Sequence, residues 1–248
     1  MGLTNEDINN KIIKIWKEKY DGQARIPHLY SPFNIGGILF IGLNPSILNL
    51  SKIKKTLEEK YEDQAKAILE DLKHLPKYLK DLSAESISEI TEMTSIIKEV
   101  HPYFAKCREI SKETGINWEH IDLFFEKETN QKNVIHDYVE EESFNSKNIK
   151  LDKFAEEQLE ISMLAIEAIE PKIIVVINAL ASKILKQQYK EDKLSKLDED
   201  KGFYTVKLNN KDIPIFFSGM LTGQRALDDG SYERLKWHIR SALKNIRE

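Results

Sequence analysis

The chain has 248 residues, of which 41% are hydrophobic and 31% are charged, and its formal net charge at pH 7 is −4. This balance excludes a protein that attracts nucleic acid through its overall charge, so such binding needs a local basic patch. No apolar run approaches the ~20 residues of a membrane span, and the charged N-terminal segment lacks the apolar core of a signal peptide. One cysteine, Cys107, and scattered histidines predict a cytoplasmic protein without disulfide, metal or cofactor.

The first elements are predicted from apolar periodicity and from capping residues. Residues 4–20 are expected to form a helix capped by Thr4, because isoleucines recur at helical spacing. The sequence "ILFIG" at 38–42 is short, apolar and bounded by glycines, which favours a buried strand. A helix is expected to begin at Pro45, since proline suits the first helical turn.

The middle of the chain is predicted to elaborate the core. Residues 51–114 are expected to form a helical insertion of two or three amphipathic helices, punctuated at Pro76 and Pro102. A second strand is predicted within 116–128, and the polar segment 129–150 is expected to be a loop.

The last hundred residues alternate between helical and strand patterns. The expected elements, in order, are a helix at 151–169, a strand at 172–178, a helix at 179–188, a hairpin arm at 202–208, a strand at 213–219 and a helix at 231–246. This alternation predicts one α/β domain over residues 1–248 with a short, mostly parallel sheet and helices on both faces. Ligands of such sheets bind at the carboxyl ends of strands, here after Gly42, Phe124 and Phe217.

Three stretches at these strand ends resemble the uracil-DNA glycosylase superfamily. "GLNPS" at 42–46 resembles the turn after the first strand of those enzymes. Residues 159–185 resemble their helix, Pro-Lys, buried strand and small-residue turn, and residues 213–231 resemble the segment before their final helix. The resemblance spans roughly 35–47 and 116–243. It departs at 218–223, where "SGMLTG" replaces the His-Pro-Ser motif, and at Asn178, where glycine is usual.

The resemblance implies a three-layer α/β/α sandwich and a DNA glycosylase-like hydrolase that removes a deaminated or damaged base by water attack on the N-glycosidic bond. Such enzymes flip the nucleotide out of the stack. Asn44 would orient the water, which a carboxamide can hold but not deprotonate. The partner would be DNA or a nucleotide-like ligand. The implied base pocket consists of Gly42, Leu43, Pro45, Ser46, Asp122 and Phe124, and the implied DNA contacts are Ser218, Gly219, Thr222, Gly223, Gln224 and Arg225.

Other interpretations of the same residues stay open. Asn44 is also a common turn residue, Asp122 can be a solvated strand end, Phe124 can be core, and Arg225 can pair with Asp228 or Asp229. The missing histidine and the negative net charge also suit a catalytically inactive nucleic-acid or nucleotide-binding protein. A hydrolase of free nucleosides would instead show no salt-dependent affinity for DNA.

Overall fold

The computed structural model describes residues 2–20, 27–46, 49–78, 83–143, 148–223 and 225–247. A five-stranded sheet with the order β2-β1-β3-β5-β4 forms the centre of this described part. Strands β2, β1, β3 and β5 run parallel to one another. The last strand, β4, pairs antiparallel with β5 at one edge of the sheet. The strands are β1 (Ile38–Gly42), β2 (Trp118–Asp122), β3 (Ile173–Val176), β4 (Tyr204–Leu208) and β5 (Lys211–Phe217).

Successive residues of the central strands point to opposite faces of the sheet. Leu39 and Ile41 of β1 belong to one apolar cluster, and Ile38 and Phe40 belong to another. All four side chains are fully buried, and each contributes about 1.5–3 kcal/mol through burial. A strand that is apolar on both sides needs cover on both sides, which confirms the predicted α/β arrangement with a mostly parallel sheet.

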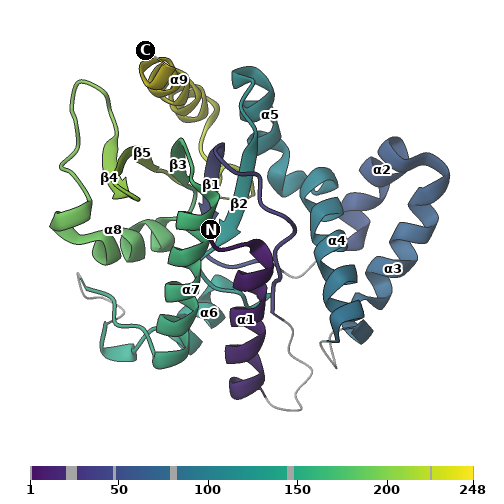
Figure 1. Cartoon of the computed structure of the whole chain (residues 1–248). Helices are drawn as coiled ribbons and strands as arrows, with labels where there is room; N and C mark the ends of the chain where they lie inside the picture. The colour runs from purple at the N-terminus through teal and green to yellow at the C-terminus, as the bar shows by residue number, and fades with distance from the viewer. Residues whose placement is uncertain are drawn as a thin grey trace.

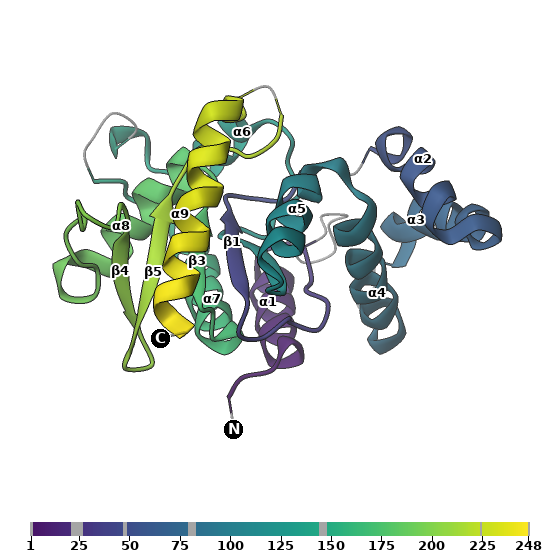
Figure 2. The same cartoon turned by 90° about the horizontal axis from the view of Figure 1, so that it is seen from above.

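Helices supply that cover. Figures 1 and 2 show α5 and α9 on the face of Phe40, with α1 and α7 on the opposite face. Thr4 caps α1 through a capping box with Asp7, which confirms Thr4 as the predicted cap. The covering helices are α1 (Asn5–Lys19), α5 (Ala105–Thr114), α7 (Lys153–Ile169), α8 (Ala179–Lys193) and α9 (Asp229–Arg247).

The helical segment between β1 and β2 lies largely beyond the β2 edge of the sheet (Figure 1). It contains four α-helices in the described residues, where two or three were predicted. Pro76 lies within α3 and does not end it, whereas Pro102 starts the short helix η2 (Pro102–Phe104). The last of the four, α5, packs on the sheet. The other three are α2 (Leu50–Tyr61), α3 (Ala65–Tyr78) and α4 (Ala84–Val100), with η1 (Glu62–Gln64) between the first two.

Two further predictions are wrong. The helix after β1 begins at Leu50 and not at Pro45, because the Pro45 carbonyl accepts hydrogen bonds from Asn44 and Glu128 across the sheet edge. The expected loop at 129–150 contains α6 (Gln131–Tyr138) and η3 (Glu141–Ser143). The Asn130 side chain caps α6. The inner face of this helix is buried, and this burial stabilises the helix despite its polar composition.

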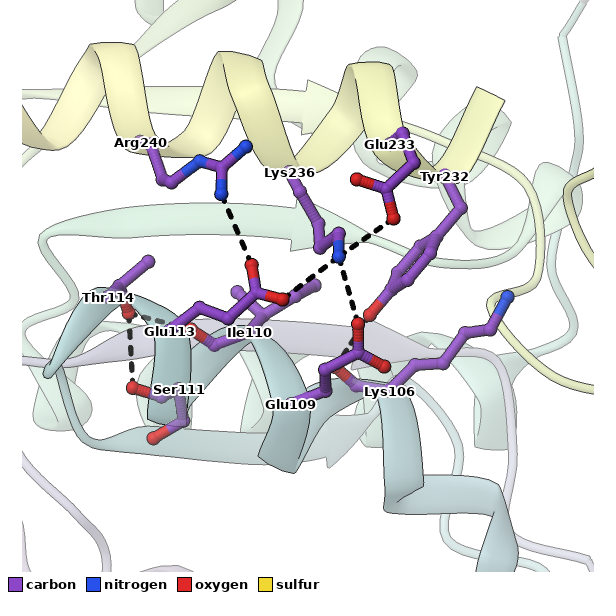
Figure 3. A network of polar contacts seen from close by, with 10 residues as sticks. All are labelled: Lys106, Glu109, Ile110, Ser111, Glu113, Thr114, Tyr232, Glu233, Lys236 and Arg240. Atoms are coloured by element: carbon purple, nitrogen blue, oxygen red, sulfur yellow. Dashed lines mark hydrogen bonds and ion pairs between the residues drawn. The ribbon is translucent and has the colours of Figure 1, made fainter. Parts of the chain in front are cut away.

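An ion-pair cluster fastens α9 to α5 across the face of the sheet, as Figure 3 shows. Lys236 of α9 is 6% exposed. Its Nζ lies 2.9 Å from carboxylate oxygens of both Glu109 and Glu113 on α5, and 2.8 Å from Glu233 on its own helix. Arg240 adds a second pair with Glu113 at 3.3 Å. The Lys236 ammonium therefore contacts three carboxylates, and Arg240 shares one of them.

We expect Lys236→Met to lower the free energy of unfolding by about 2 kcal/mol. The substitution leaves Glu109 and Glu233 without their cation and Glu113 with Arg240 alone, but these carboxylates keep contact with water, so the loss stays below that of a fully buried pair. Urea unfolding measures the change. Glu233→Gln removes the most exposed carboxylate and should cost less than about 0.5 kcal/mol. Equal losses in the two variants would contradict the central role of Lys236.

Candidate functional site

The carboxyl ends of β1 and β2 continue as irregular segments that remain side by side. The N–H of Phe124 donates to the carbonyl of Leu43 at 2.9 Å. On the outer side, the N–H of His28 donates to the carbonyl of Phe125 at 2.7 Å. We call this end of the sheet, at which the parallel strands finish, the carboxyl edge, and it is where mostly parallel sheets place their ligands. The segments that form it are 27–30, 42–46 and 123–128.

Asn44 ties the turn after β1 to the segment after β2. Its Nδ2 donates to the carbonyl of Glu128 at 2.6 Å and to that of Pro45 at 3.2 Å, with the carbonyl of Glu126 at 3.5 Å. These acceptors fix the orientation of the amide, because a flip would place Oδ1 against carbonyl oxygens. Asn44 Oδ1 is then buried and has no hydrogen-bond partner among the described residues. Such an orphaned acceptor is uncommon in a folded protein.

Gly42 makes room for a polar pair on the neighbouring strand. In the register of the sheet Gly42 lies opposite Asp122, and a Cβ built on it would stand 2.1 Å from Asp122 Oδ1 and 3.2 Å from His120 Nε2. The His120 Nε2 atom is 3.9 Å from Asp122 Oδ1, and it too has no hydrogen-bond partner in the described chain. The ring of His120 packs against Phe104 at 5.0 Å. Both side chains of the pair are almost fully buried.

Burial sets the charge state of this pair. It raises the pKa of Asp122 to about 8 and, together with the charge of Lys98, lowers the pKa of His120 to about 3. Near pH 7 the carboxyl therefore keeps its proton and the imidazole is neutral. A protonated carboxyl donates a hydrogen bond, which a carboxylate cannot do.

The contribution of Asp122 to the free energy of unfolding should fall by roughly 1.5 kcal/mol between pH 6.5 and pH 8. The raised pKa of Asp122 contributes stability that is complete below 3.8, its value in the unfolded chain, and is lost as the pH rises towards 8. The lowered pKa of His120 acts in the opposite sense and still adds roughly 0.4 kcal/mol above pH 6.5, where the imidazole of the unfolded chain is half protonated. Lys127, whose pKa burial lowers to about 8, adds stability mainly above that pH. Urea unfolding at the two pH values measures the fall.

Asp122→Asn is the matched variant for this measurement. It keeps the shape of the side chain and removes the titration, so its stability should not fall between the two pH values, and its difference from the wild type isolates the contribution of Asp122. A fall of the same size in Asp122→Asn would assign the pH dependence to another group.

Two more ionisable side chains lie at this edge. His28 and Lys127 are half-buried, and the pKa of His28 lies well below its ordinary value because of burial and the nearby charge of Lys127. Lys127 stands between Glu126 and Glu128, two of the three residues whose carbonyls accept from the Asn44 amide. The edge therefore carries a neutral imidazole and an amine of lowered pKa.

The loop after β5 reaches the same side of the sheet through Tyr103. The N–H of Ser218 continues the parallel pairing by donating to Val176 at 2.8 Å, and the Thr222 hydroxyl donates to the Tyr103 carbonyl at 3.1 Å. The Tyr103 ring in turn lies 5.7 Å from that of His120. Gly223 has φ +94°, a conformation that favours glycine. The structure thus connects this loop with the Asp122 side of the edge.

The remaining predicted site residues are distributed differently. Leu43 and Phe124 are buried in the core, and Phe124 packs on Tyr138 at 5.1 Å, so we assign both to packing. Ser46 and Arg225 are exposed. The carbonyl of Pro45 accepts a hydrogen bond from the N–H of Glu128, and Gly219 lies close to Leu227. Gln224 lies outside the described residues.

A hollow of about 210 Å³ adjoins the segment after β2, whose backbone carbonyls accept hydrogen bonds from Asn44. The side chains of Glu126 and Glu128 contribute to its wall, together with residues of α6. Glu126 is engaged by the Tyr138 hydroxyl at 2.5 Å. The acidic wall disfavours a phosphate in this hollow. A second hollow of about 430 Å³ lies elsewhere, between α7, α8 and the segment around Lys150.

Comparisons with known proteins add no relative. No protein-family model matches the chain, and no curated protein is detectably similar to it in sequence. Within the described ranges, no three His, Cys, Asp or Glu side chains group so that they could hold a metal ion. None of the helices described is both long and apolar enough to cross a bilayer.

His120 and Lys127 are residues at this end of the sheet that were not assigned to the site from the sequence. The spacing of "HID" on a strand places His120 on the same face as Asp122, which is a usable signal. For Lys127 no signal exists in the sequence, because its burial depends on segment 27–30 lying beside it.

Proposed function

We propose that the protein is a DNA glycosylase-like hydrolase that removes a deaminated or damaged base, on a three-layer α/β/α sandwich of the uracil-DNA glycosylase type. The observation that carries the proposal is the hydrogen bonding of the Asn44 side chain. Its Nδ2 is held by backbone carbonyls, and its Oδ1 is left as an unpaired acceptor at the carboxyl edge of the sheet. An acceptor fixed in this way can orient a water molecule toward a sugar carbon.

Cleavage of the N-glycosidic bond places positive charge on the sugar and negative charge on the departing base. Water enters late, so its orientation matters more than its deprotonation, and a carboxamide suffices for that task. A donor near the base then stabilises the leaving anion. In this proposal the protonated carboxyl of Asp122, two strand positions from the buried imidazole of His120, supplies such a donor.

The loop after β5 would hold the strand while the base enters the site. Arg225 is exposed, and a guanidinium suits a phosphate contact. Thr222 anchors the loop to Tyr103, so the loop is fixed relative to the Asp122 pair. This arrangement supports a grip on one strand beside the base pocket.

The test is incubation of the purified protein with labelled oligonucleotides that carry uracil, hypoxanthine or xanthine, followed by alkali to reveal abasic sites. We expect alkali-sensitive breaks at one of these bases and none in the unmodified control. Binding of the same oligonucleotides is measured at low and high salt. Absence of breaks with every base would contradict the hydrolase.

A catalytically inactive nucleic-acid or nucleotide-binding protein is the second candidate. The observation that favours it is the burial of Asn44 Oδ1, which solvent does not reach. A water molecule can meet this atom only when a neighbouring group moves. Salt-sensitive binding without breaks would select this candidate, in which Asn44 only joins the two segments.

A further inference from the structure

The outer side of α9 carries an exposed tryptophan between two basic side chains. Trp237 is 59% exposed, and Arg234 and Lys244 are exposed as well. Arg234 lies three residues before Trp237, and Lys244 lies seven residues after it. With Ser241 they share one face of the helix, because positions three, four and seven residues apart lie on the same side. Figures 1 and 2 show α9 as the outermost element on its face of the sheet. We call these four residues the α9 face.

The two cations of the α9 face are available to an anion. In the part of the chain that the structure describes, neither Arg234 nor Lys244 forms an ion pair. The Arg234 guanidinium donates to the Ser231 hydroxyl at 3.1 Å, and this hydroxyl donates to Asp228 at 2.7 Å. A guanidinium has five N–H donors, so this bond positions the group and leaves most of its donors to a ligand.

The acidic side chains beside the α9 face are already engaged. Lys236 lies 2.8 Å from Glu233, and Arg240 lies 3.3 Å from Glu113. Figure 3 shows both of these cations directed toward α5. The α9 face itself therefore carries two positive charges and no acid, although the chain as a whole has a net charge of −4.

A lone aromatic ring between two cations suits a strand of nucleic acid. An unpaired base stacks on such a ring, and the cations on either side contact phosphates. A protein partner instead needs a larger apolar patch at the centre of the contact. The other large exposed hydrophobic residue described on this helix, Ile246, lies nine residues after Trp237 and so on the opposite side. A duplex keeps its bases stacked inside and offers none to the ring.

We propose that the α9 face binds single-stranded nucleic acid, with an unpaired base stacked on Trp237 and phosphates held by Arg234 and Lys244. This site goes beyond base removal, because it lies on a helix outside the carboxyl edge and requires no damaged base. The helix follows the loop after β5. Trp237 lies two turns into α9, about 12 Å along its axis, so a strand held at that loop can also reach the ring.

The test measures binding of a fluorescein-labelled, unmodified oligothymidylate strand by fluorescence anisotropy. We expect Trp237→Ala to weaken binding roughly tenfold, the order of one lost stacking contact. Ile35→Ala is the matched control, because Ile35 is 61% exposed and lies before β1. It removes an apolar side chain of similar exposure outside α9 and should bind like the wild type. Equal affinity of Trp237→Ala and the wild type overturns the proposal.

The salt dependence of the same binding tests the two cations. Arg234→Gln/Lys244→Gln should reduce the slope of log affinity against log salt concentration by roughly 1.4, about 0.7 for each phosphate contact on a single strand. Lys54→Gln/Lys55→Gln removes the same charge from exposed positions on α2 and should leave the slope unchanged. Equal slopes in the two double variants would assign the effect to overall charge and contradict the phosphate contacts.

Tryptophan emission tests stacking directly. Trp16 is buried and Trp118 is half-buried, so a strand that stacks on Trp237 should quench the emission of the exposed indole. Trp237→Phe keeps an aromatic face, so it should bind within about threefold of the wild type and lose the quenching. No binding of the strand, or tighter binding of polyglutamate, overturns the proposal. Because the strand carries no damaged base, a failure of the glycosylase would leave these results unchanged.

Discussion

Replacing Asn44 with alanine is expected to lower the rate of base excision by roughly 100- to 1000-fold, on the order of what one fixed hydrogen-bonding group contributes to a polar transition state. The variant loses Oδ1, the acceptor that orients the water, and also the Nδ2 bonds to Glu128 and Pro45. Those bonds should cost only about 1 kcal/mol of stability. Alkali-sensitive breaks per unit time, measured in single turnover, give the rate.

Asn178→Ala is the matched control for this prediction. Asn178 lies at the end of the neighbouring strand β3, is buried, and caps α8 by accepting from Leu180 and Ala181. Its loss should cost about 1 kcal/mol of stability through the missing cap and leave excision nearly unchanged. Excision that persists in Asn44→Ala would place the activity elsewhere. An equal loss of excision in both variants would make stability the cause.

Gly42→Ala is expected to destabilise the fold by about 3 kcal/mol, the upper part of the range for inserting an atom into a packed interior. The added Cβ would stand 2.1 Å from Asp122 Oδ1, a distance at which one of the two groups has to move. The carboxyl can escape only by giving up its position beside His120. Thermal and urea unfolding of the purified variant measure the loss.

The double variant Gly42→Ala/Asp122→Ala identifies the cause. Removal of the carboxyl frees the space that the new methyl group needs, so the double variant should be more stable than Gly42→Ala alone. Gly230→Ala is the control, since it adds a methyl group in the first turn of α9, where the nearest atom is 3.3 Å away. It should be neutral or slightly stabilising. A double variant as unstable as Gly42→Ala would show that backbone conformation, not the carboxyl, sets the requirement.

The core elements could be predicted because their sequences leave few options. The segments around Ile38–Gly42 and Ile173–Val176 are apolar on both faces, and α7 carries buried residues at helical spacing. The helix start predicted at Pro45 was wrong because proline permits a helix start without requiring one. Hydrogen bonds to the segment after β2 hold Pro45 in a turn instead. The helix α6 was missed because its polar residues outnumber the few that become buried.

The position of the candidate site could be proposed from the sequence only as far as local sequence determines it. "GLNPS" identified the turn at Asn44, and the rule for parallel sheets identified the edge. The environment of each side chain could not be predicted, because it depends on contacts between distant segments. Asp122 is buried beside His120 and not solvated, and Phe124 turns into the core. Both outcomes arise from η2 and α6, whose positions the sequence does not reveal.

The pairing of β1 with β2 has a consequence for how the chain folds. Ile38 pairs with Trp118, although all of residues 43–117 lie between the two strands. Closing so long a loop is slow, because the chain loses conformational entropy before the contacts between the two strands stabilise it. The cost grows only with the logarithm of length, by about 0.6 kcal/mol for each doubling. The helices α2, α3 and α4 can form from local contacts first and shorten the search. The candidate site, which needs both strands, is then among the last parts of the molecule to assemble.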